Sequence, residues 1–129
     1  MSGRVVHFEI PYDDGDRARA FYASVFGWQV MPLPEMSYTM VMSGPSGDQG
    51  PTEVGFINGG MMQREEPFVG PNLVIDVDNL EKALEAVNQA GGTTVSERQA
   101  VGDMGFAAYF RDTEGNLVGL WESAPTPSG

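Results

Sequence analysis

The chain carries the same order of predicted elements twice. A β-forming run, VVHFEI at residues 5–10, precedes an amphipathic helical pattern that ends at Gly27. A second run, NLVIDV at residues 72–77, precedes another helical pattern that ends at Gly91 and Gly92. A period of roughly 65 residues is too long for the stacked units of a solenoid, so it indicates two copies of one supersecondary unit. Two such copies can build a binding site between them.

Each helical pattern places apolar residues at i, i+3, i+4 and i+7, which is the spacing of one helix face. These residues are Ala18, Phe21, Tyr22 and Val25 in the first copy and Leu80, Ala83, Leu84 and Val87 in the second. Asp13, Asp14 and Asp16 offer capping oxygens to the first helix, and Asp78 or Asn79 offers one to the second. The sequence therefore predicts one helix in each copy.

Three further β-rich segments follow the helix in each copy. They cover residues 28–31, 38–43 and roughly 53–58 in the first copy, and 93–98, 106–111 and 117–121 in the second. The sequence therefore predicts an α+β fold of two tandem βαβββ modules, whose curved mixed β-sheets surround a cleft. We expect a single domain over residues 1–129, with modules at 4–62 and 71–123 and a linker at 63–70.

The composition excludes several classes of function. The formal net charge is −11 with only 7 basic residues, which disfavours binding to nucleic acid. The chain has no cysteine, so disulfides and thiolate chemistry are absent. No apolar run is long enough to cross a bilayer and residues 1–4 lack a signal-peptide core, so we expect a cytoplasmic protein without a membrane partner. The acidic surface favours solubility, and it could also attract a cationic ligand.

Three segments resemble the glyoxalase, bleomycin-resistance and extradiol-dioxygenase superfamily, also called the vicinal-oxygen-chelate fold. They are VVHFEIPYDDGDRARAFYASVFGW in the first copy, and VIDVDNLEKALEAVNQAGG and YFRDTEGNLVGLWE in the second. The resemblance implies a glyoxalase-like fold and a homodimer. The metal-dependent members of this superfamily hold a divalent metal in the cleft, and each copy supplies one ligand from its first strand and one from its last. The resemblance implies the same ligand positions in this chain.

Of the four implied ligand positions, only His7 carries a suitable side chain. The corresponding first-strand residue of the second copy is Asn72, and its last-strand residue is Gly119. The predicted last strand of the first copy has no carboxylate inside it, and Glu53 lies at its edge. Because catalytic zinc-type sites use about three histidine or carboxylate ligands, we predict no metal ligands and no cofactor, with a divalent metal as the alternative.

His7 and Glu9 are the candidate catalytic residues. His7 is the only histidine, and strand alternation places Glu9 on its face. His7 could serve as a general base or polar anchor, since imidazole titrates near neutrality, and Glu9 would raise its pKa in a shared pocket. The alternatives are a hydrogen-bonded core histidine and a carboxylate at the rim.

Asn58, Asn72 and Trp121 are the candidate ligand-binding residues. Trp121 shares a strand face with Gly119, whose missing side chain would leave space beside the indole. Such an indole can form an apolar or cation-binding wall, although a core tryptophan is an equally good interpretation. Asn58 precedes a glycine pair that permits close approach of backbone.

We therefore expect a small-molecule-binding protein that holds an organic ligand in a cleft between the modules without the standard metal. The alternative is a metal-dependent lyase, isomerase or dioxygenase of the same superfamily that uses His7 and nonstandard ligands. In a further enzymatic version, His7 and Glu9 act as acid and base. The expected partners are a small molecule and a second copy of the chain.

Overall fold

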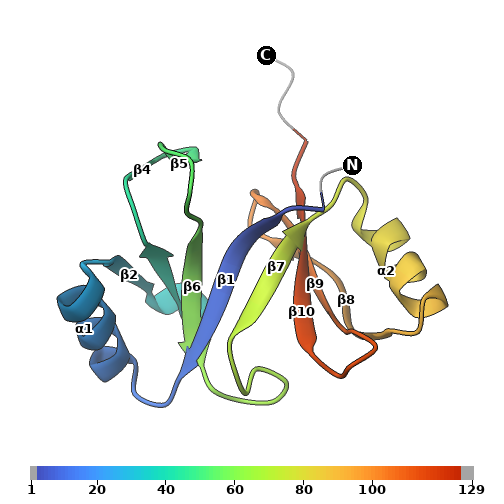
Figure 1. Ribbon diagram of the computed structural model, residues 1–129, viewed down its shortest axis with the longest axis horizontal. Helices are drawn as coiled ribbons and strands as arrows, with labels where there is room; N and C mark the ends of the chain where they lie inside the picture. Colours follow the sequence, from blue (N-terminus) through green and yellow to red (C-terminus); the bar gives the residue numbers. More distant parts are fainter. Residues whose placement is uncertain (1–2, 126–129) are drawn as a thin grey trace. The chain divides into compact units, whose positions relative to one another are not determined.

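The computed structural model describes residues 3–125 and divides into two compact units (Figure 1). The first unit is Val6–Pro71. The second unit comprises the residues up to Val5 together with those from Asn72 onward. The backbone N–H of Gly3 donates to the carbonyl of Asp76, and the N–H of Asp76 donates to the carbonyl of Arg4. These bonds explain why the start of the chain belongs to the second unit.

The first unit contains a four-stranded sheet, one helix and a small hairpin. Its elements are β1 (Val5–Tyr12), α1 (Gly15–Phe26), β2 (Gln29–Leu33), the 3-10 turn η1 (Pro34–Met36), β3 (Tyr38–Met42), β4 (Ser46–Gly47), β5 (Gly50–Pro51) and β6 (Asn58–Gln63). The strand order is β2-β3-β6-β1, with β1 parallel to β6 and the other pairs antiparallel. In Figure 1, β4 and β5 form a separate hairpin beyond β3 and β6.

The second unit repeats this arrangement without the extra hairpin. Its elements are β7 (Asn72–Asp76), α2 (Leu80–Gln89), β8 (Thr93–Val101), β9 (Gly105–Arg111) and β10 (Leu117–Ser123). The strand order is β7-β10-β9-β8, with β7 parallel to β10. The first strand of each unit therefore pairs with the last, which confirms the predicted α+β fold of two βαβββ modules.

The prediction for the last strand of the first module was wrong in position. The sequence indicated residues 53–58, whereas β6 covers Asn58–Gln63. Val54, Phe56 and Ile57 are good β-formers, but Gly55 between them has a φ of 105°, outside the range of extended strands. Val54 is also 98% exposed. The segment before β6 is therefore a connection, and Asn58 begins the strand rather than ending it.

The helix caps follow the sequence. The Asp14 side chain accepts a hydrogen bond from the N–H of Arg17 at 3.0 Å, and the Asn79 side chain accepts one from Lys82 at 3.0 Å. Gly27 ends α1 with a φ of 72°, the left-handed conformation that glycine adopts without strain. These local bonds fix where each helix leaves its sheet.

In the second unit, α2 packs on one face of the sheet and forms the core there. The buried core residues are Val77, Leu80, Leu84, Ala108, Phe110 and Leu120. In the first unit, aromatic side chains join α1 to the sheet, since Tyr22 stacks on Trp28 at 4.8 Å and Trp28 contacts Phe8 at 5.5 Å between ring centroids. Phe8 therefore faces α1, and strand alternation turns His7 and Glu9 toward the opposite face.

None of the helices among residues 3–125 is long and apolar enough to cross a membrane.

Candidate functional site

The structure joins His7 and Glu9 through a third residue, Tyr38. Nε2 of His7 lies 2.8 Å from the phenol oxygen of Tyr38, and this hydroxyl donates to Oε2 of Glu9 at 3.2 Å. Glu9 is 5% exposed and His7 is partly buried. The two predicted catalytic residues thus belong to one hydrogen-bonded cluster, His7–Tyr38–Glu9, within the first unit.

An ionised Glu9 predicts the tautomer of His7. A carboxylate only accepts hydrogen bonds, so it accepts the single hydroxyl proton of Tyr38. Nε2 of His7 is then predicted to carry a proton and to donate it to the phenol oxygen. Nδ1 is left with a lone pair, and no hydrogen bond to it occurs among residues 3–125. The cluster therefore presents a neutral imidazole with a free acceptor nitrogen.

Burial lowers the pKa of His7 below its ordinary value of 6.5 because it disfavours the charged imidazolium. The expectation that Glu9 would raise this pKa was therefore wrong. Tyr38 stands between the two groups in the hydrogen-bonded chain, and desolvation is the larger effect. A histidine of this kind is neutral at physiological pH, where it can accept a proton or a hydrogen bond.

Gly60 makes room for the cluster. Strand β6 pairs with β1 so that Gly60 lies opposite Glu9, and it also lies opposite Met40 of β3. A Cβ atom at Gly60 would collide with the hydroxyl and ring of Tyr38. The tyrosine ring therefore crosses the space that a side chain at position 60 would take, and this crossing brings its hydroxyl to His7 and Glu9.

The second unit has a matching glycine and tyrosine. Gly60 pairs with Glu9, two residues after His7, and Gly119 pairs with Val74, two residues after Asn72. A Cβ atom at Gly119 would lie 3.0 Å from Cε1 of Tyr109 and 3.0 Å from Cγ2 of Val74. The expectation of open space at Gly119 was wrong, because Tyr109 and Val74 fill it.

These positions do not fit the divalent metal that the family resemblance implies. By the register, the last-strand ligand positions are Gly60 and Gly119, which have no side chains and are covered by tyrosine rings. Asn72 is a neutral amide, and Nε2 of His7 is bonded to Tyr38. Among residues 3–125, no group of three or more histidine, aspartate or glutamate side chains is arranged to hold a metal ion.

Asn58 lies beside His7 in the β1–β6 register, but its amide is used to hold a loop. Its Oδ1 accepts from the N–H of Ser43 at 3.0 Å, and its Nδ2 donates to Oγ of Ser46 at 2.8 Å. The role of Asn58 in ligand binding stays a prediction. Its visible role is to tie the segment after β3 to the start of β6.

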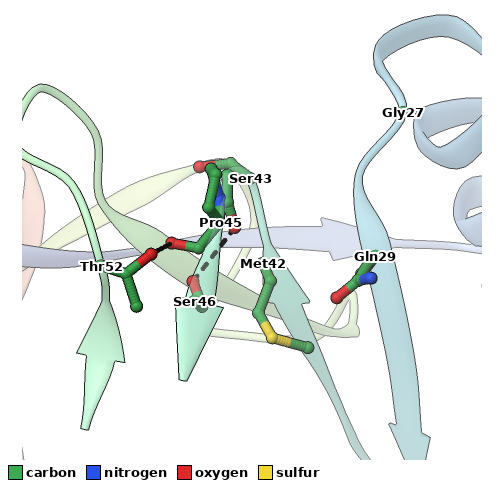
Figure 2. A pocket seen from close by; sticks show the side chains of 8 residues that line it. Gly27, Gln29, Met42, Ser43, Pro45, Ser46 and Thr52 are labelled. Carbon is green, nitrogen blue, oxygen red and sulfur yellow. Dashed lines mark hydrogen bonds between the residues drawn. The ribbon is translucent and has the colours of Figure 1, made fainter. Parts of the chain in front are cut away.

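The same loop forms one wall of a pocket of about 440 Å³ in the first unit (Figure 2). Gln29 and Met42 approach it from β2 and β3, and Ser43, Pro45, Ser46 and Thr52 surround it. The side-chain hydroxyls of the pocket donate to backbone carbonyls of the protein. Ser43 donates to Ile57 at 2.6 Å, Ser46 to Gly44 at 3.1 Å and Thr52 to Pro45 at 3.0 Å. No titratable side chain lines the pocket, so it offers no acid–base chemistry.

Asn72 and Trp121 share a face of the second sheet. Trp121 pairs with Asp76, and Asp76 is four residues from Asn72, so alternation puts all three side chains on one side. The indole of Trp121 covers Gly105, where an added Cβ would lie 2.6 Å from Cζ2, and its N–H donates to Ser123 at 3.1 Å. This face is opposite the one that carries Leu120 and packs on α2.

Sequence reasoning missed Tyr38, and it noted the pair Gly59–Gly60 without connecting it to a side chain. Tyr38 was placed in a strand without a role, because the register of β3, β6 and β1 depends on contacts between distant segments. The available signal was the pair Gly59–Gly60, because glycine inside a strand often marks the close approach of a neighbouring group. That signal points to Tyr38 only when β6 is placed at Asn58–Gln63.

Comparisons with known proteins agree with this architecture. A family model described as "Bleomycin resistance protein-like N-terminal" matches residues 4–44. A glyoxylase-like domain-containing protein of Didymella fabae is 32% identical over 90% of this chain and 91% of its own length. A probable lactoylglutathione lyase of Vibrio parahaemolyticus is 25% identical over 99% of this chain and 96% of its own length.

The fold is also similar to that of methylmalonyl-CoA epimerase from Mycobacterium tuberculosis. The TM-score is 0.64, with 18% sequence identity over 96% of this chain and 90% of the epimerase. At this identity the likeness concerns the fold alone.

Proposed function

Because the chain belongs to the glyoxalase, bleomycin-resistance and dioxygenase superfamily, we propose that it binds a small organic molecule through the His7–Tyr38–Glu9 cluster, without a metal. The observation that carries the proposal is the chain of hydrogen bonds from Nε2 of His7 through Tyr38 to Glu9. It leaves Nδ1 of His7 as an acceptor on a partly buried, neutral ring.

The cluster favours a ligand that donates a hydrogen bond. Nδ1 of His7 can accept a hydrogen bond, whereas the hydroxyl proton of Tyr38 is already donated to Glu9. The ligand must therefore supply the donor. The formal net charge of −11 supports the same preference, because it attracts ligands that carry positive charge along with their N–H groups. We also predict that ligand binding does not depend on divalent cations, because the residues at the implied metal-ligand positions do not suit a metal.

A fragment screen on chelator-treated protein tests this function. Small organic fragments are screened by ligand-observed NMR in the presence of EDTA, and each hit is measured by calorimetry against variants. We expect hits that lose about fivefold in affinity in Tyr38→Phe and His7→Gln, because one hydrogen bond between uncharged groups contributes about 1 kcal/mol. The matched control is Tyr22→Phe, which removes a phenol hydroxyl from α1 on the other side of the sheet.

Two results would contradict the proposal. Hits that bind Tyr38→Phe and His7→Gln as tightly as the unaltered protein would place the site elsewhere. Binding that appears only after nickel, zinc or manganese is added would make the metal a part of the site.

A second candidate is metal-independent proton transfer, which the lowered pKa of His7 favours. Nδ1 would accept a proton from the substrate, and the imidazolium would be stabilised through Tyr38 by Glu9. The names of the similar proteins give two compounds to assay, methylmalonyl-CoA and lactoylglutathione. Turnover in EDTA that is lost in His7→Gln would support this candidate, and no turnover of either compound would leave binding as the function.

A further inference from the structure

Four of the methionines in residues 3–125 lie on the sheet face that carries His7 and Glu9. Gly60 of β6 pairs with Glu9 on one side and with Met40 on the other. Met40 in turn pairs with Met31 of β2. Residues that are paired across neighbouring strands point to the same side of a sheet, and so does every second residue along a strand. The methionine face consists of Met31, Met40, Met42 and Met62.

The methionine face retains surface that another molecule can cover. Its members are half-buried or exposed, and Met31 is 50% exposed. Met61, the chain neighbour of Met62, points to the other face and is 0% exposed. Met61 pairs with Thr39, whose hydroxyl accepts a hydrogen bond from Arg19 of α1 at 3.0 Å. Met61 therefore belongs to the packed side of the sheet, whereas Met62 lies on the side of His7.

The pocket of about 440 Å³ adjoins the methionine face. Met42 belongs to both, and Figure 2 shows it beside Gln29, its partner on β2, which also lines the pocket. Asn58 connects the pocket to His7, because it pairs with His7 and its carboxamide is bonded to the loop that lines the pocket. The His7–Tyr38–Glu9 cluster, the methionine face and the pocket are therefore continuous within the first unit.

We propose that the ligand of this face is an elongated aromatic molecule, with an N–H group on Nδ1 of His7 and its rings over the methionine face toward the pocket. This inference rests on the proposed function and names the chemistry of its ligand. Methionine side chains are flexible, and their thioether sulfurs make favourable contacts with aromatic rings. His7 on β1 and Met42 on β3 are separated by one strand, so their backbones lie about 10 Å apart. Two linked aromatic rings span this distance.

Biphenyl-4-carboxamidine is a suitable probe, because it carries N–H donors at one end of two linked rings. Its positive charge also suits a chain with a formal net charge of −11. The protein is labelled with ¹³C at the methionine methyl groups and titrated with the probe in EDTA, and each signal is assigned by its loss in a Met→Leu variant. Ring currents should shift the signals of Met40 and Met42 and leave that of Met61, on the opposite face, unchanged.

Two further compounds separate the parts of the probe. Biphenyl-4-carboxylate keeps the rings and has no N–H donor, and acetamidine keeps the donors and has no rings. We expect both to bind at least about tenfold more weakly than the probe, because each lacks one of the two interactions. Acetamidine should also leave the methionine signals unchanged.

Met42→Ala should weaken binding of the probe about fivefold in calorimetry, because it removes the thioether beneath the rings. Met61→Leu is the matched control, and it should bind the probe like the unaltered protein because residue 61 lies on the other face. Circular dichroism checks that both variants are folded. The methyl shifts come from the unaltered protein, so they decide the inference even if a variant does not fold.

Three results would overturn the inference. They are no binding of the probe, binding without shifts at Met40 and Met42, and equal affinity for biphenyl-4-carboxylate. Methionine signals that move with protein concentration and not with the probe would assign this face to a second copy of the chain instead. The fragment screen uses ligands of any class, so the proposed function can hold there while the aromatic class fails here. Methyl shifts that persist with equal affinity in His7→Gln would overturn the proposed function and leave the methionine face as the ligand surface.

Discussion

Nε2 of His7 and the phenol oxygen of Tyr38 lie 2.8 Å apart, although the two residues are separated by 31 positions in the chain. The contact depends on Gly60, which lies on the strand between β1 and β3 and has no side chain to separate them. It also ties the protonation of the only histidine to Glu9 through one hydroxyl.

The pH dependence of stability should show the partly buried, neutral state of His7. Burial lowers the pKa of His7 in the folded protein. At pH values between that pKa and 6.5, His7 therefore binds a proton in the unfolded chain but not in the folded one. The contribution of His7 to stability is fully present above pH 6.5 and is lost as the pH falls below it. Urea unfolding of the protein and of His7→Gln across pH 5–8 should therefore give curves that differ most at the acidic end. Parallel curves would contradict the lowered pKa.

Gly60→Ala should destabilise the protein by about 1–3 kcal/mol, because the new methyl group collides with Tyr38. The measurement is urea unfolding. The matched control is Gly70→Ala, where a Cβ meets nothing within 4 Å and the change should be within about 0.5 kcal/mol. In a Tyr38→Ala background the cost of Gly60→Ala should disappear, and a cost that persists would show that the clash has another source.

Tyr38→Phe should cost about 1–3 kcal/mol of stability, because it leaves Nε2 of His7 and the buried Glu9 without the hydroxyl between them. Tyr22→Phe, which changes a ring that stacks on Trp28 in the same unit, should cost less than about 0.5 kcal/mol. Equal costs for the two variants would show that the phenol of Tyr38 contributes nothing beyond its ring.

The chain is also predicted to form a homodimer, and the exposed apolar face of α1 supports this proposal. Phe21, Val25 and Phe26 are 53%, 56% and 60% exposed, and a cluster of exposed apolar side chains of this kind is common at protein interfaces. Light scattering should give twice the mass of the 13.9 kDa chain. Val25→Lys should shift the equilibrium toward the monomer, and a monomeric unaltered protein would contradict the proposal.

The sequence predicted the parts of the fold that depend on local interactions. The apolar face of the second helix and the caps at Asp14 and Asn79 follow from residues within a few positions of each other. The start of β6 was misplaced because Val54, Phe56 and Ile57 have the composition of a strand, and only the backbone at Gly55 shows that they are not one.

The shared face of His7 and Glu9 was predictable from the sequence, whereas the contacts of the candidate site were not. Alternation in β1 correctly placed His7 and Glu9 on one face, opposite Phe8 and α1. The role of Tyr38 depends on the register among three strands, and the filling of the space at Gly119 depends on the ring of Tyr109. Neither relationship is encoded in a short segment of sequence.

Long-range ¹H–¹⁵N NMR reads the protonation of the His7 imidazole without ambiguity, because the chain has one histidine. We expect a neutral ring at pH 7 with the proton on Nε2 and a lone pair on Nδ1, and a spectrum that stays the same when one equivalent of zinc or nickel is added. A proton on Nδ1, or a change in the ring signals with stoichiometric metal, would rule out the metal-free His7–Tyr38–Glu9 cluster as described.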